Sequence, residues 1–124
     1  MAADVIDRKM NHLERKLFLL QRLSAVVLAP MVLIHLLLIF YAVKQGMTGE
    51  DILQRTAGSP LWAIFYLAFV VTVSIHAPIG LRNVLNEWTG LSKSITNKLM
   101  VALFVIFILL GLRSVIAVIA PGGW

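Results

Sequence analysis

The chain has 124 residues, of which 60% are hydrophobic and 14% are charged, and its formal net charge is +5. This composition excludes a soluble globular domain, because such domains average about 25% charged residues, and it predicts an all-α membrane protein with one domain over residues 1–124. The sequence contains no cysteine, which excludes disulfides, thiolate metal sites and iron–sulfur clusters ligated by this chain.

The first residues, 1–17, are polar and charged, and Val5, Met10, Leu13 and Leu17 recur among them near helical spacing. This pattern predicts an amphipathic interfacial segment that lies on the membrane surface or against a soluble partner. A frayed polar tail is an equally good interpretation. Because this polar segment precedes the first apolar stretch and no small-residue cleavage site follows that stretch, the sequence does not indicate a removable signal peptide.

Three apolar stretches are long enough to cross a membrane, at about residues 23–43, 61–81 and 99–120. Each matches the roughly 20 residues that an α-helix needs to span about 30 Å of hydrocarbon. Pro30 lies inside the first stretch and Pro78 near the end of the second. Because proline removes a helical hydrogen bond, we expect kinks at both positions.

Basic residues are distributed unevenly around these spans. The loop between the first two spans carries only Lys44 and Arg55. The eight that flank the opposite ends of the spans are Arg8, Lys9, Arg15, Lys16, Arg22, Arg82, Lys93 and Lys98. The positive-inside rule therefore predicts a cytoplasmic N-terminus and an outer C-terminus. Because the charges do not gather on one soluble face, they do not indicate binding to nucleic acid.

His76 lies near the end of the second span, and Gly80 follows it one helical turn later. A histidine in hydrocarbon is costly unless it has a partner, and a glycine at this spacing leaves room for a flat macrocycle. The pattern predicts a haem ligand at His76. The alternative is a histidine that is hydrogen-bonded to a facing helix.

His35 and Arg113 are polar residues at other depths in the membrane. Counting 1.5 Å per residue places His76 about 9 Å and His35 about 20 Å from the cytoplasmic boundary. If both histidines bind iron, they would therefore serve two haems, and a histidine from another subunit would complete each one. A hydrogen bond to a neighbouring carbonyl explains His35 equally well. Arg113 is expected to meet a haem propionate, a lipid phosphate or, by snorkelling, water.

Two motifs carry a family resemblance. Residues 21–25 read Gln-Arg-Leu-Ser-Ala, and the second motif has Gly80 four residues and Glu87 eleven residues after His76. They resemble the arginine-x-serine-small signature and the second-helix haem motif of membrane-anchor subunits in the succinate dehydrogenase and fumarate reductase family. Three spans in about 120 residues also fit the architecture of those anchors.

The resemblance implies a role for several residues. His76 matches the axial ligand of haem b, Arg22 matches an arginine near the propionates and the quinone, and Ser24 belongs to the same quinone-pocket motif. In the two-haem members, the first and second helices each provide a histidine. His35 is thereby implied as a second iron ligand, so that one or two haems remain possible, and Arg113 is a candidate propionate partner.

Glu87 matches an acidic residue beside the quinone site, and in the family a tyrosine follows it and binds a quinone carbonyl. Trp88 occupies that position here, and its indole can donate a hydrogen bond but has no acidic proton to relay. Trp88 could position the quinone ring. An interfacial anchor is an equally good interpretation, since tryptophan is enriched at membrane boundaries.

The resemblance also implies partners. A flavoprotein subunit would oxidise succinate, an iron–sulfur subunit would carry electrons, and a second membrane-anchor subunit would share the haem. The chain would lie in the bacterial inner membrane. Ubiquinone or menaquinone would then be reduced in electron transport linked to the tricarboxylic acid cycle. This chain alone has no dinucleotide fingerprint, so catalysis would belong to those partners. A different class of function, a haem-free structural anchor or helper subunit of another membrane complex, stays open.

Overall fold

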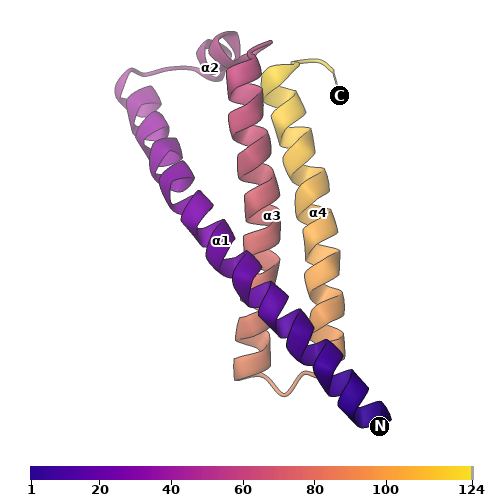
Figure 1. The fold of residues 1–124 in the computed structure, drawn as a ribbon. Helices are drawn as coiled ribbons and strands as arrows, with labels where there is room; N and C mark the ends of the chain where they lie inside the picture. Colours follow the sequence, from indigo (N-terminus) through magenta and orange to yellow (C-terminus); the bar gives the residue numbers. More distant parts are fainter. Residues whose placement is uncertain (124) are drawn as a thin grey trace.

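The computed structural model describes residues 1–123 apart from the side chain of Met10, whose part in the expected amphipathic pattern lies outside the described residues. The described helices are α1 (Ala2–Lys44), α2 (Gly49–Thr56), α3 (Pro60–Trp88) and α4 (Lys93–Ile119). Within this range, α1, α3 and α4 are each long and apolar enough to cross a membrane (Figure 1). The predicted all-α membrane fold with three spans is confirmed for this part of the chain.

Helix α1 is longer than the span expected within it. It begins at Ala2, so most of residues 1–17 form the first turns of the same helix that continues into the apolar stretch. At 1.5 Å per residue its 43 residues extend over about 65 Å. Pro30 in α1 and Pro78 in α3 lie inside their helices without ending them. A proline removes only one backbone hydrogen bond, which a membrane helix tolerates.

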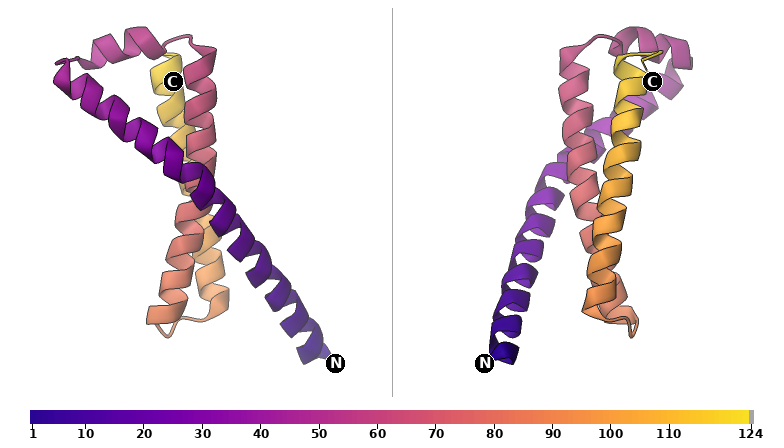
Figure 2. Two further views of the ribbon diagram at one scale, coloured as in Figure 1. Left: turned by 60° about the vertical axis from the view of Figure 1, so that its left-hand side comes forward. Right: turned by 90° about the vertical axis from the view of Figure 1, so that its right-hand side faces the viewer.

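The helices are arranged so that the first residues of α1 and the α3–α4 loop lie at one end of the molecule, called the N-terminal end below (Figure 1). Helix α2 and the last turns of α4 lie at the opposite end. Helices α3 and α4 pack side by side, while α1 crosses α3 at an angle and diverges from it toward α2 (Figure 2). The contacts between α1 and α3 therefore include the middle of α1, from Glu14 to His35.

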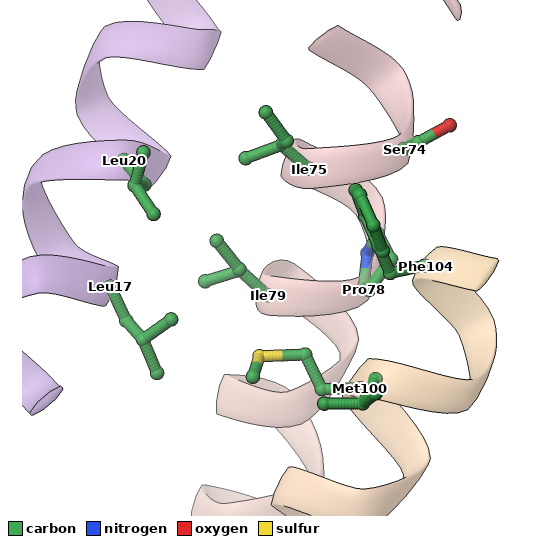
Figure 3. Close-up of a pocket in the computed structure, with 9 residues that line it drawn as sticks. Leu17, Leu20, Ser74, Ile75, Pro78, Ile79, Met100 and Phe104 are labelled. Carbon is green, nitrogen blue, oxygen red and sulfur yellow. The ribbon is translucent and has the colours of Figure 1, made fainter. Parts of the chain in front are cut away.

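Two kinds of contact hold the long helices together. Helix α4 approaches α3 closely at Gly111, where an added Cβ would lie 2.3 Å from Val70 Cγ1, as expected for a small residue at a membrane helix interface. Near the N-terminal end, apolar side chains from three helices line a common pocket, among them Leu17 of α1, Ile79 of α3 and Met100 of α4 (Figure 3). Leu17 and Ile79 are buried there.

Helix α2 is tied to the end of α4. The hydroxyl of Thr56 donates to the carbonyl oxygen of Val118 at 2.7 Å, and the backbone N–H of Gly58 donates to the carbonyl oxygen of Ile119 at 2.7 Å. The final carbonyls of a helix have no partner inside the helix, so these bonds satisfy groups that would otherwise be open. Gly58 has φ +68°, which glycine adopts readily.

Most of the apolar surface of the spans is not covered by the chain itself. In the most apolar window of each helix, 17% of the residues are buried in α1, 17% in α3 and 6% in α4. A membrane helix satisfies its own backbone, so its exposed side chains can face lipid or another helix. Broad faces of all three spans, and of α4 above all, are thus available to the bilayer and to partner subunits.

Candidate functional site

A charged side chain that the sequence indicated only as a boundary residue lies buried at the N-terminal end. Arg82 of α3 is 1% exposed, and its guanidinium forms a bidentate ion pair with the carboxylate of Glu14 on α1. Arg82 Nε also donates to Asn97 Oδ1 of α4 at 2.5 Å. One arginine therefore links all three long helices. Lys93 forms a second ion pair with Glu14, with its Nζ 3.5 Å from Glu14 Oε1.

Glu14 precedes the apolar part of α1. The hydrogen bonds from Arg82, together with the positive charges of Arg82 and Lys93, hold the pKa of the Glu14 carboxyl below its usual value, although partial burial opposes this effect. Glu14 is therefore kept ionised.

A second polar contact joins α3 to α4 nearby, where the buried Thr96 hydroxyl donates to Asn86 Oδ1 at 2.7 Å.

The structure brings His76 together with Ser24, although 52 residues separate them. Ser24 Oγ lies 3.0 Å from His76 Nδ1 and 3.0 Å from the backbone carbonyl oxygen of Gln21. Ser24 is 6% exposed, while His76 is half-buried. Within the described part of the chain, Nδ1 is the ring nitrogen of His76 that has a hydrogen-bond partner, and Nε2 has none.

Gly80 lies against α1 one turn after His76. A Cβ added there would lie 3.2 Å from Nε2 of Gln21, tighter than ordinary van der Waals contact. The glycine therefore leaves room for the amide of Gln21 between the two helices, which is a physical reason for it that the sequence did not indicate. Gln21 Oε1 is buried and has no hydrogen-bond partner among the described residues.

A hollow of about 610 Å³ opens between α1 and α3 at the N-terminal end, and we call it the Arg22–Glu87 hollow. Its polar lining residues are Glu14, Arg15, Gln21, Arg22, Asn83 and Glu87. Arg22 comes from α1 and lies with its guanidinium carbon 5.5 Å from the centre of the Phe18 ring, while Glu87 comes from the last turn of α3. The volume is in the range of small-molecule sites.

The other two residues expected at a quinone do not line this hollow. Trp88 is the final residue of α3 and is 83% exposed. Ser24 is buried and contacts His76 instead. Of the four residues that the sequence grouped at a quinone site, the structure thus brings Arg22 and Glu87 into one hollow and places Ser24 and Trp88 elsewhere.

His35 lies on α1 at another level. Its ring centroid is 5.4 Å from that of Phe69 and 6.3 Å from that of Tyr66, both on α3. It lines a pocket of about 260 Å³ together with side chains of α2 and α3. Ser24, the contact of His76, is eleven residues earlier on α1, which corresponds to about 16 Å along the helix. The two histidines therefore occupy different depths.

Arg113 is exposed on α4 and does not line the pocket that contains His35. The sequence placed these two residues at similar depths, which says nothing about which faces of their helices they occupy. The structure accordingly does not bring Arg113 and His35 into one pocket.

Three residues of the site were not predicted from the sequence: Arg82, Gln21 and Glu14. Arg82 was counted only as a boundary charge, although the polar residues Asn83 and Asn86 that follow it in the same helix were a signal for a polar contact surface. Gln21 adjoins Arg22 in the first motif, but nothing in one sequence indicates that its amide would lie against Gly80. The sequence does not indicate the ion pair of Glu14 either, because its partner Arg82 is 68 residues away.

A family model described as "Succinate dehydrogenase/Fumarate reductase transmembrane subunit" matches residues 7–113. The matched range contains α2, α3 and most of α1 and α4, and it includes His35, His76 and the residues of the Arg22–Glu87 hollow. Neither the curated proteins nor the solved structures contain a match to the chain.

Proposed function

The chain belongs to the family of succinate dehydrogenase/fumarate reductase transmembrane subunits, and on that premise we propose that it helps to bind haem b and to form the quinone site of a succinate:quinone oxidoreductase. The observation that carries the proposal is the contact of His76 with Ser24 between α1 and α3, which holds one ring nitrogen and leaves the other unbonded among the described residues. Electrons would pass from an iron–sulfur subunit to ubiquinone or menaquinone.

The residues at His76 fit a haem. The neutral imidazole nitrogen is the usual protein ligand of b-type haem iron, and His76 is half-buried with Nε2 unbonded among the described residues. The largely uncovered spans leave room for a second membrane-anchor subunit to supply the other ligand. Arg22 is a candidate partner for the propionates. When bound, haem b supplies a one-electron redox centre.

His35 and Arg113 are the candidates at the second level. His35 is half-buried beside Tyr66 and Phe69, which form an apolar aromatic surround of the kind that suits a haem. A second haem there would be separate from one at His76, because His35 lies against Tyr66 and Phe69, ten and seven residues before His76 on α3. Arg113 would serve a propionate at this level only if the partner subunit brings the two together.

The Arg22–Glu87 hollow suits a quinone headgroup. A quinone has two carbonyl oxygens that accept hydrogen bonds, and Arg22 offers guanidinium donors. Reduction also requires protons, and the hollow contains two carboxylates. Glu14 is held ionised by Arg82, so it is a poor proton donor, whereas Glu87 is exposed and can exchange protons with water. Trp88 serves best as an interfacial anchor.

The N-terminal end is proposed to face the cytoplasm of a bacterium, with the chain in the inner membrane. The excess of basic residues at this end supports that orientation. The flavoprotein and iron–sulfur subunits would contact this end, since electrons must reach the Arg22–Glu87 hollow. The uncovered faces of α3 and α4 would meet the second anchor subunit and lipid.

Purification of the intact complex tests this function. We expect a flavoprotein and an iron–sulfur protein to be recovered with the chain and identified by mass, and a reduced-minus-oxidised spectrum to show b-type bands. The complex is purified through an affinity tag on the chain, and membranes that carry the untagged chain are the control for nonspecific recovery. Recovery without the soluble subunits, or a spectrum without b-type bands, would favour the haem-free structural anchor or helper subunit.

The quinone site gives a separate prediction. We expect Arg22→Gln to lower kcat/KM for succinate-dependent quinone reduction at least about tenfold, because a hydrogen bond to a charged donor contributes about 1.5–3 kcal/mol. Glu87→Gln should lower kcat more than KM, since it removes a proton carrier. Reduction of a soluble dye by the flavoprotein should be unchanged in both. If Trp88→Phe reduced activity as much as Arg22→Gln, the headgroup would lie elsewhere.

A further inference from the structure

Ser24 occupies the middle of a short hydrogen-bond chain between α1 and α3. Its Oγ lies 3.0 Å from the carbonyl oxygen of Gln21 on its own helix and 3.0 Å from Nδ1 of His76 on the other. The residue is 6% exposed, so water has little access to compete for these contacts. These two contacts determine whether the Ser24 hydroxyl donates its proton to Gln21 or to His76.

A serine hydroxyl has one proton, and a backbone carbonyl oxygen can only accept. For the contact between Ser24 and Gln21 to be a hydrogen bond, the Ser24 hydroxyl must donate to the carbonyl. The same hydroxyl must then accept from Nδ1 of His76, which therefore carries the ring proton. In the reverse arrangement, with Ser24 donating to Nδ1, two oxygen lone pairs would face each other at 3.0 Å.

The geometry points to Ser24 as a positioning residue for His76, which keeps the imidazole in the Nδ1–H tautomer and leaves the lone pair on Nε2 for a metal. In a neutral imidazole one nitrogen donates and the other accepts, so fixing Nδ1–H fixes Nε2 as the ligand atom. This inference rests on the proposed function, in which His76 binds haem iron. It also explains why Ser24 lies away from the Arg22–Glu87 hollow.

The hydrogen bond also has an electronic consequence. When the second nitrogen of a ligating histidine donates to an acceptor, the ring becomes a more basic ligand and its orientation is fixed. A more basic ligand stabilises oxidised iron relative to reduced iron, and hydrogen bonding around the ligands is one of the protein's means of setting a haem potential. Removing the Ser24 hydroxyl should therefore make the haem easier to reduce.

Two substitutions of nearly equal shape isolate the hydroxyl. Ser24→Thr keeps the oxygen and adds a methyl group, while Ser24→Val has the same branched shape without the oxygen. In a redox titration of the purified complex, we expect the haem of the Thr variant to have the same midpoint potential as the haem of the wild type. The Val variant should show about a threefold higher ratio of reduced to oxidised haem at a fixed potential, which is about 30 mV for a one-electron couple.

Ser24→Ala provides a second comparison that adds no methyl group, and the same upward shift is expected. Loss of haem in the Val variant with retention in the Thr variant would also support the inference. Equal midpoints and equal haem content in the Thr, Val and Ala variants would overturn it. A wild-type complex without haem, or a His76→Ala complex with unchanged haem content, would instead overturn the proposed function, and this inference with it.

Discussion

His76→Ala is expected to abolish the b-type bands that arise from the haem at its level, with the occupancy of that haem falling more than tenfold. The methyl group of alanine offers no ligand, and even changes to residues that only hydrogen-bond a ligating side chain cost about 10–100-fold in metal affinity. His35→Ala should retain this haem, because the two histidines contact different residues at different depths. Quantitative difference spectra of the purified complexes, normalised to flavin, provide the measurement.

His12→Ala is the matched control for this experiment. His12 is the third histidine of the chain and lies exposed in the first turns of α1, outside the apolar stretch. Its substitution should leave the spectrum unchanged. Bands of wild-type intensity in the His76→Ala complex would show that the imidazole is only a hydrogen-bonding group between helices. The His35→Ala spectrum then separates one haem from two, since loss of about half the signal means two.

The sequence predicted the three spans well because length and hydropathy are summed over many residues and need no knowledge of contacts. It also contained an unused signal for α1. Residues 2–29 include neither glycine nor proline, so nothing in the chain interrupts a helix between the polar first turns and the apolar stretch. The change in composition indicates where the membrane surface lies. It does not indicate where the helix begins.

The site was less predictable, because an apolar span presents similar side chains on every face. Periodicity can show which face of an amphipathic helix is buried, but in α3 and α4 it cannot indicate which face meets which neighbour. The contacts of His76 with Ser24 and of Arg82 with Glu14 join positions 52 and 68 residues apart. Local spacing gave the candidate residues, and the crossing of α1 over α3 decided which of them meet.

Arg82→Met is expected to destabilise the subunit by about 3 kcal/mol. The substitution removes one partner of a buried ion pair, and such changes typically cost about 3–5 kcal/mol, with the lower value fitting here because Glu14 is 35% exposed. It also leaves Asn97 without its donor. The midpoint of detergent-induced or thermal loss of assembled complex measures the effect, and Lys9→Met, at an exposed position of α1, is the matched control. Equal stability of the two variants would contradict a structural role for Arg82.

The ion pair also predicts how stability depends on acid. The pKa of Glu14 lies below its ordinary value of 4.5, so the contribution of the pair is fully present above pH 4.5 and is lost as the pH falls through the lower value of the folded protein. Glu14→Gln should remove this part of the acid sensitivity and should also be destabilising, because it leaves the buried cation of Arg82 without a counter-charge beside Lys93. In the double variant, destabilisation smaller than the sum of the two single effects would measure their coupling. Strict additivity would mean that the cation and the carboxylate act independently, and that Arg82 stabilises the bundle through Asn97 instead.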